Sequence, residues 1–178
     1  DCMAGEVSKD LTRRRLLPEG SVEADEQGIS HVHDSDYFAQ HMHNCDLVNL
    51  EDMLQNGTVI SETLIERPHS FSTACNIATQ IIAQVASNQY GGQSNSLAHL
   101  APFVQVSRVK IRQEVIGEMK DIGIAVTEEQ IEKLTEERLG SENTKGTQTT
   151  QYQVVTLLTT KGKATFVTDS IYPDEAKK

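Results

Sequence analysis

The apolar residues at the start of the chain recur at helical spacing. They are Met3, Val7, Leu11 and the Leu16/Leu17 pair. Pro18 stops this pattern, so residues 3–17 predict an amphipathic helix. The following SVEADEQG segment predicts two more helical turns, capped by Ser21 and ended by Gly28.

The next third of the chain alternates between extended and helical patterns. Residues 29–33 and 41–48 predict two extended segments that carry most of the histidines. Asn49 is a suitable N-cap for a short helix, LEDMLQ, which Asn56-Gly57 ends. VISETLIE, residues 59–66, predicts one strand.

Three helical patterns follow Pro68. Residues 70–90, SFSTACNIATQIIAQVASNQY, are apolar around much of a helix, which predicts a buried element. Pro102 suits the first turn of a long helix that runs to about residue 122. Thr127 and Gln130 form a capping box for a helix over 128–139, and the two helices predict a hairpin.

The end of the chain returns to turn-rich and β-branched sequence. SENTKGTQTT, residues 141–150, predicts a polar linker, and residues 150–168 predict two strands joined by a tight turn at Lys161-Gly162. Asp169, Ser170 and Pro173 are expected to weaken any strand beyond Thr168. Strands at both ends with helices between them indicate a single mixed α/β domain.

Composition narrows the classes of function. The chain has 178 residues with 26 acidic and 16 basic side chains, a net charge of -10. This balance argues against a surface that binds nucleic acid or anionic lipid. The sequence also lacks an apolar run of the roughly 20 residues that a membrane-spanning helix needs. Its three cysteines, which include no CxxC pair, suit a reducing compartment, so we expect a cytoplasmic protein.

The segment HVHDSDYFAQHMHNCDL, residues 31–47, concentrates the candidate chemistry, with four of the 6 histidines. If residues 31–33 form a strand, His31 and His33 lie on one face, as an HxH metal pair requires. His41, His43 and Cys45 would share a face by the same argument. A metal site, polar residues hydrogen-bonded at strand ends, and a Cys45 nucleophile with a histidine base all remain open at this point.

Two other features favour structural roles. Cys75 lies within the apolar helix pattern, where a small buried hydrophobe is expected. The Gly91-Gly92 pair could bring backbone amides close to a phosphate, but such a pair more often simply ends a helix.

Longer stretches add a family resemblance. These are HNCDLVNLEDMLQNGTVIS, PHSFSTACNIATQIIAQVASNQYGGQS, LAHLAPFVQVSRVKIR and GTQTTQYQVVTLLTTKGKATFVT, in this order over nearly all of residues 3–168. Together they resemble the anaerobic, class III ribonucleoside-triphosphate reductases. The resemblance implies a glycyl-radical enzyme that reduces ribonucleoside triphosphates to deoxyribonucleoside triphosphates inside a ten-stranded α/β barrel.

The resemblance also implies roles for individual residues. Cys45 matches the catalytic cysteine of the first barrel strand, which faces the substrate's 2′-position. His31 and His33 match a segment beside the ribose and phosphates, and so become substrate-orienting donors rather than metal ligands. Further residues on segments that line the same pocket are Asn44, Ser87, Gln89, Tyr90 and Gly91.

By the same resemblance, residues 1–178 form the first half of the barrel, with a helix pair over 98–140 for homodimerisation and effector binding. The ATP-cone, the thiyl-loop cysteine, the structural zinc site and the glycyl-radical loop are expected outside these residues. An S-adenosylmethionine iron-sulfur activase would generate the radical, and ATP and deoxynucleotides would act as effectors. We therefore expect the 178 residues alone to be inactive. The alternatives are a non-catalytic nucleotide-binding or dimerisation module and, third, a metal-dependent hydrolase.

Overall fold

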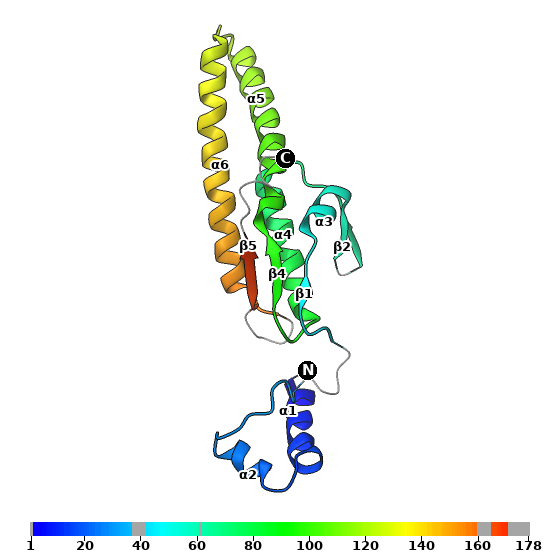
Figure 1. Ribbon diagram of the computed structural model, residues 1–178. Coiled ribbons are helices and arrows are strands. Elements are labelled where there is room, and N and C mark those ends of the chain that lie inside the picture. Colours follow the sequence, from blue (N-terminus) through cyan, green and yellow to red (C-terminus); the bar gives the residue numbers. More distant parts are fainter. Residues whose placement is uncertain (1, 37–41, 61, 160–164, 171–178) are drawn as a thin grey trace.

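The computed structural model describes residues 2–36, 42–60, 62–159 and 165–170. Helix α1 (Cys2–Leu11) continues into a π-helical turn, η1 (Thr12–Leu16), and α2 (Ser21–Glu26) follows (Figure 1). The predicted N-terminal helices are therefore confirmed, but the N-cap of α2 is Gly20 and not the predicted Ser21. The predicted strand over 29–33 is wrong, because these residues form bends and irregular backbone between α2 and a turn in which Asp34 has φ of 58°.

A three-stranded parallel sheet forms the centre of the remaining chain. Its strands are β1 (Asp46–Leu47), β4 (Gln93–Ser96) and β5 (Val167–Ser170), in the order β1-β4-β5 (Figure 1). The mixed α/β class is confirmed, while the ten-stranded barrel remains a prediction. The expectation that Asp169 and Ser170 weaken a strand is wrong, since both pair with β4.

The segment after β1 forms a short helix and a hairpin. Asn49 caps α3 (Leu50–Asn56) by accepting a hydrogen bond from the Asp52 amide at 3.3 Å, as predicted. Strands β2 (Thr58–Ile60) and β3 (Thr63–Ile65) then pair in antiparallel fashion. The single strand predicted over 59–66 is therefore wrong, because the chain reverses at Glu62, whose φ is 65°.

Helix α4 (Phe71–Ser87) carries most of the core. Ala74, Cys75, Ala78 and Ile81 are all at most 1% exposed, and they pack with Leu50 and Leu54 of α3 and with Phe103. The prediction of a buried helix is confirmed. A 3₁₀ turn, η2 (Leu97–Leu100), links β4 to the next helix.

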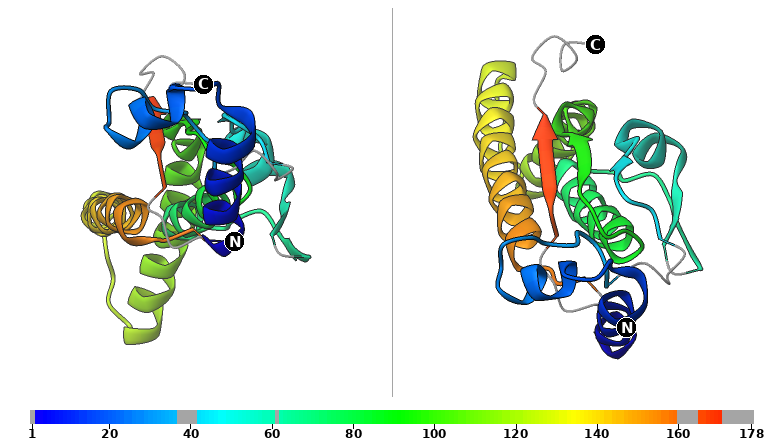
Figure 2. Two further views of the ribbon diagram at one scale, coloured as in Figure 1. Left: turned by 90° about the horizontal axis from the view of Figure 1, so that it is seen from below. Right: turned by 60° about the horizontal axis from the view of Figure 1, so that its bottom comes forward.

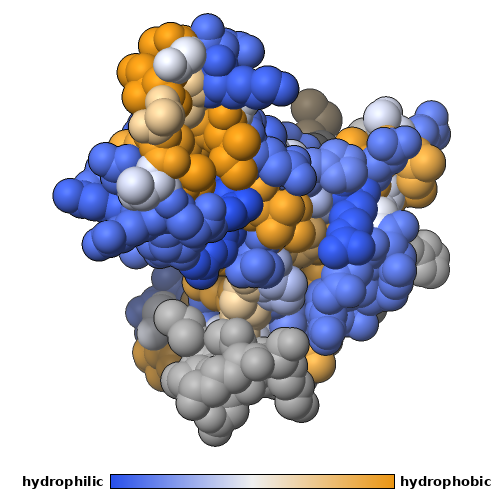
Figure 3. Space-filling model, turned by 90° about the horizontal axis from the view of Figure 1, so that it is seen from above, coloured by the Kyte–Doolittle hydropathy of each residue, from blue (hydrophilic) through white to orange (hydrophobic). Residues whose placement is uncertain are grey.

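Helices α5 (Pro102–Ile122) and α6 (Glu128–Thr156) form the predicted hairpin, which extends away from the sheet (Figure 1). Both halves of the capping box at Thr127 are present. A second apolar cluster holds the helices together and consists of Ile111, Val115, Ile131 and Leu139. Figure 3 looks onto the molecule from the hairpin end and shows apolar surface there, where Ile122 and Ile124 are exposed.

Helix α6 is much longer than predicted. The polar linker over 141–150 and the first strand after it are both wrong, because α6 runs unbroken to Thr156. Its C-terminal half lies along α4 (Figure 2). Glu142 accepts a hydrogen bond from the Ser72 amide at 3.1 Å, and Gln153 donates to Asn76 at 3.2 Å. These tertiary contacts outweigh the weak helix propensity of the segment.

The predicted turn at Lys161-Gly162 lies outside the described residues. Thr165 and Phe166 lead directly into β5, which pairs with β4 rather than with residues 150–159. None of the helices in the described part of the chain is both long enough and apolar enough to span a membrane.

Candidate functional site

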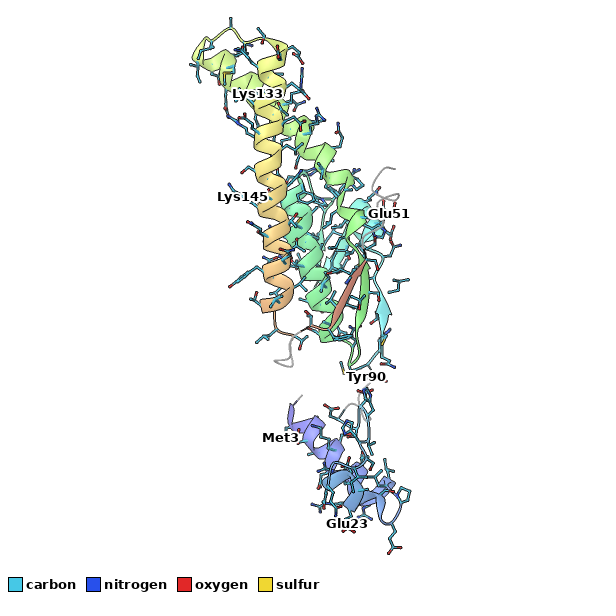
Figure 4. The ribbon with its side chains drawn as sticks, turned by 60° about the vertical axis from the view of Figure 1, so that its left-hand side comes forward. Met3, Glu23, Glu51, Tyr90, Lys133 and Lys145 are labelled. Carbon is cyan, nitrogen blue, oxygen red and sulfur yellow. The ribbon has the colours of Figure 1, made fainter. Side chains whose placement is uncertain are left out.

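The segment around Cys45 runs parallel to the segment that follows α4. The His43 amide donates to the Asn88 carbonyl at 3.3 Å, and the Tyr90 amide donates to the His43 carbonyl at 3.1 Å. The Gly91 amide donates to the Asn44 carbonyl at 2.7 Å. Figure 4 labels Tyr90 at this end of the strands. Two stretches that are more than forty residues apart in the sequence therefore meet at Cys45.

The pairing shifts register at this point. His43 bridges Gln89, whereas Asp46 pairs with Gln93, so three residue steps on one side oppose four on the other. The extra residue falls within the Tyr90-Gly91-Gly92 segment and has the character of a β-bulge. Bulges bend a strand and redirect its side chains, and they are frequent beside active sites.

Gly91 packs directly on Cys45. A β-carbon at position 91 would lie 2.3 Å from the Asn44 carbonyl oxygen and 2.8 Å from the Cys45 Sγ. These distances are shorter than any ordinary contact, so only glycine fits here without movement. The Cys45 thiol also donates a weak hydrogen bond to the Asn44 Oδ1 at 3.5 Å. The sulfur thus lies between a backbone that approaches closely and a side-chain amide.

The thiols of Cys45 and Cys75 differ in their exposure to solvent. Cys45 is exposed, whereas Cys75 is buried in α4. Burial raises the pKa of the Cys75 thiol above its ordinary value. Because the thiolate is the reactive form, Cys75 is chemically inert by comparison, and Cys45 is the candidate for chemistry.

Two ionisable side chains, His43 and Asp46, lie on the same short segment. His43 Nδ1 is 3.2 Å from Asp46 Oδ1, and both residues line a cavity of about 410 Å³ beside α4. From sequence alone, His43 is a candidate metal ligand or a candidate base for Cys45. Its pairing with Asp46 depends on the bend at Asn44 and was not predicted.

The segment beside Cys45 also carries Gln89 and Tyr90, and Asn44 precedes the cysteine. Their contacts differ. Gln89 is only 3% exposed, and its Nε2 donates to the Gly91 carbonyl at 3.4 Å, which braces the bulge from within. Ser87 is in the last turn of α4, and its hydroxyl donates to the Ala83 carbonyl at 2.8 Å. Gln89 therefore shapes the backbone near the thiol, whereas the Ser87 hydrogen bond lies within α4.

His31 and His33 belong to a separate cluster. His31 Nδ1 is 3.9 Å from Asp25 Oδ1, and His33 pairs with Asp34. Asp25 also accepts from Arg13 Nε at 2.8 Å, and this hydrogen bond holds the pKa of its carboxyl below the ordinary value. Among the described residues, these contacts all lie within 13–34 and do not reach Cys45. His41 is outside the described residues.

The metal interpretation has no geometric support in the described residues. Nowhere in residues 2–36, 42–60, 62–159 and 165–170 do three or more His, Cys, Asp or Glu side chains gather closely enough to hold a metal ion.

Comparison with known proteins extends this picture. The family model for anaerobic ribonucleoside-triphosphate reductase matches residues 1–178. The chain belongs to this family. The anaerobic ribonucleoside-triphosphate reductase of Escherichia coli K12 is 40% identical over 171 residues, and that of Haemophilus influenzae is 38% identical over 172 residues. The enzyme of that name from phage T4 is 38% identical over 171 residues.

The chain spans about a quarter of the length of these reductases. Each match covers 94% of this chain, but only 23% of the two bacterial relatives and 27% of the phage relative. The predicted family is therefore confirmed. Assignment of Cys45 and the surrounding residues to catalysis comes from the family resemblance and stays a proposal, with which the geometry around Cys45 agrees.

Proposed function

We propose that this chain is part of a longer polypeptide that reduces ribonucleoside triphosphates to deoxyribonucleoside triphosphates by radical chemistry. The observation that carries the proposal is the exposed Cys45 thiol, held against Gly91 at a parallel strand pair. Membership of the anaerobic reductase family agrees with this assignment.

Cys45 would act on the 2′-side of the ribose. Replacing the 2′-hydroxyl by hydrogen releases water and requires two electrons and two protons. A thiol suits this task because it donates hydrogen readily and is a reversible redox centre. The exposed position of Cys45 leaves its sulfur accessible, while Gly91 and Asn44 restrict where the sulfur lies.

Substrate orientation would come from two groups of residues. His31 and His33 would donate to the ribose and phosphates, with Asp25 holding the loop that carries them. Around Cys45, we propose substrate contacts from the bulge and its flanks. The residues concerned are Asn44, Ser87, Gln89, Tyr90 and Gly91.

Other components would lie outside these 178 residues. They are a glycyl radical formed by an S-adenosylmethionine iron-sulfur activase, a thiyl-forming cysteine and a structural zinc. Helices α5 and α6 would form a homodimer interface where ATP and deoxynucleotides act as effectors. Exposed apolar residues on α5, Val109 at 50% and Ile116 at 38%, support a contact with a second copy. We also propose a cytoplasmic location.

Anaerobic assay of the full-length gene product that contains this chain tests the proposal. With activase, S-adenosylmethionine and reductant, it should form deoxynucleotide, and Cys45→Ala should reduce this to background. Cys75→Ala is the matched control, because that thiol is buried and should leave the chemistry intact. The 178 residues alone should be inactive.

Two results would contradict this function. Full turnover by the Cys45→Ala enzyme would remove Cys45 from the chemistry. Saturable nucleotide binding with no turnover by the full-length protein would instead favour a non-catalytic module.

A further inference from the structure

The face of the parallel sheet that carries Cys45 is the face turned away from α4. On the opposite face, Gln93 Nε2 donates to the Ile82 carbonyl of α4 at 2.7 Å (Figure 1). Side chains alternate along a strand, so residues in register and residues two apart share a face. The Cys45 face carries Cys45, Leu47, Gly92, Ser94, Phe166 and Thr168. None of these six side chains is charged, so this face suits an uncharged part of a ligand rather than a phosphate.

Phe166 supplies an aromatic ring on this face, and the ring lies against Gly92. The Gln93 amide donates to the Phe166 carbonyl at 3.0 Å, which fixes Phe166 beside β4. A β-carbon at position 92 would lie 2.8 Å from Phe166 Cε1, so the ring occupies the space that a side chain of residue 92 would fill. Phe166 is nevertheless 72% exposed. The ring therefore rests on the backbone and stays open on its other side.

The Phe166 ring and the Cys45 sulfur lie against adjacent glycines. A β-carbon at Gly91 would lie 2.8 Å from Cys45 Sγ, and the Cα of Gly92 follows at about 3.8 Å. Strand β4 lies between β1 and β5, and neighbouring strands are about 4.8 Å apart. The ring and the sulfur are thus separated by roughly one to two strand spacings, about 5–10 Å.

We propose that Phe166 stacks on the base of the ribonucleoside triphosphate whose ribose lies at Cys45, an inference that rests on the proposed function. The base is bonded to C1′, the neighbour of C2′. A ribose with its 2′-side at Cys45 therefore places the base about one strand spacing away, within reach of the ring. Stacking on an aromatic side chain tolerates any base, which suits an enzyme that reduces ribonucleoside triphosphates in general. Further chain of the longer polypeptide would enclose the base against this face.

Equilibrium dialysis of the full-length gene product with CTP, without the activase, tests this contact separately from turnover. Phe166→Leu keeps an apolar side chain but removes the flat ring, so the Kd of CTP should rise at least about fivefold. Phe166→Tyr should keep the wild-type Kd, because its ring also stacks. Ribose 5-triphosphate has no base, so Phe166→Leu should leave its Kd unchanged. Leu64→Ala, at a position 68% exposed on β3, is the matched control and should bind CTP normally.

Gly92→Ala provides a second test that leaves Phe166 in place. Gly92 has no positive φ, and the three atoms nearest to an added β-carbon all belong to the Phe166 ring. The substitution should therefore displace the ring and raise the Kd of CTP, while the Kd of ribose 5-triphosphate stays unchanged. If Phe166→Leu fails to fold, Gly92→Ala decides by the same two measurements.

Three results would overturn the proposal. The wild-type protein fails to bind CTP saturably, or Phe166→Leu binds CTP as tightly as the wild type because further chain covers the ring. In the third, Phe166→Leu weakens ribose 5-triphosphate as much as CTP, which would indicate a purely structural role. Failure of the proposed function gives a different result, since the activated wild-type enzyme then forms no deoxynucleotide although its CTP binding responds to Phe166→Leu.

Discussion

Gly91 sets the position of the Cys45 sulfur through its lack of a side chain. The sequence showed the Gly-Gly pair, and its pattern indicated a helix end, but α4 already ends at Ser87 with Asn88 as its C-cap. The close contact of Gly91 with Asn44 and Cys45 could not be predicted from local sequence. That contact depends on pairing between segments more than forty residues apart, and only the family resemblance placed Gly91 near the substrate.

Gly91→Ala should destabilise the chain by about 1–3 kcal/mol, the usual cost of forcing extra volume into a packed site. The added β-carbon would meet a backbone oxygen at 2.3 Å, and backbone cannot move aside as a flexible side chain can. Urea unfolding measures the change. Gly117→Ala on α5 is the matched control, with no atom within 4 Å of its β-carbon. Equal effects of the two substitutions would contradict the packing argument.

Helices with a strong apolar periodicity or a clear cap could be predicted from the sequence. The buried α4 and the capping box of α6 are examples. The length of α6 was not predictable, because Gly146 and its polar neighbours resemble a linker. Gly146 lies where a β-carbon would be 2.8 Å from the Phe71 ring, so its small size permits close contact between α6 and α4. Long-range packing decides the conformation of this segment.

The hairpin of α5 and α6 should lose stability in acid through Glu118. Arg138 donates to both Glu118 oxygens, at 2.9 and 2.7 Å, and this holds the pKa of Glu118 below its ordinary value. A carboxyl with a lowered folded-state pKa stabilises the fold above its unfolded pKa and loses this contribution as pH falls through the folded value. Glu118→Gln should lower the urea midpoint near pH 7 and leave it less sensitive to acid.

Because Glu118 is exposed, the effect should be small, as for most surface ion pairs. Urea midpoints measured between about pH 7 and pH 3 provide the test. Glu129→Gln, at an exposed position of α6, is the control and should retain the wild-type acid dependence. A Glu118→Gln midpoint that falls with pH as steeply as the wild type would contradict the assigned role.

At the scale of the whole molecule, the chain presents surfaces typical of part of a larger assembly. In the part of the chain that the structure describes, the parallel sheet has three strands, and large apolar side chains such as Leu47 and Phe166 are exposed beside it. The relatives are about four times as long, which agrees with further chain covering such surfaces. The family and the mixed α/β class were predictable from sequence, whereas strand pairing over long separations was not.

The proposed homodimer would bury one face of α5. Val109 and Ile116 are seven residues apart on α5, so they share a helical face, and a second copy would cover them. The double variant Val109→Glu, Ile116→Glu should weaken dimerisation at least about tenfold, because carboxylates would be buried at the contact. Sedimentation equilibrium measures this change.

Ile29→Glu is the control for this double variant. Ile29 is 75% exposed and lies outside the hairpin, so the Ile29→Glu chain should dimerise normally. A wild-type chain that stays monomeric at all concentrations would refute a dimer interface formed by α5 and α6.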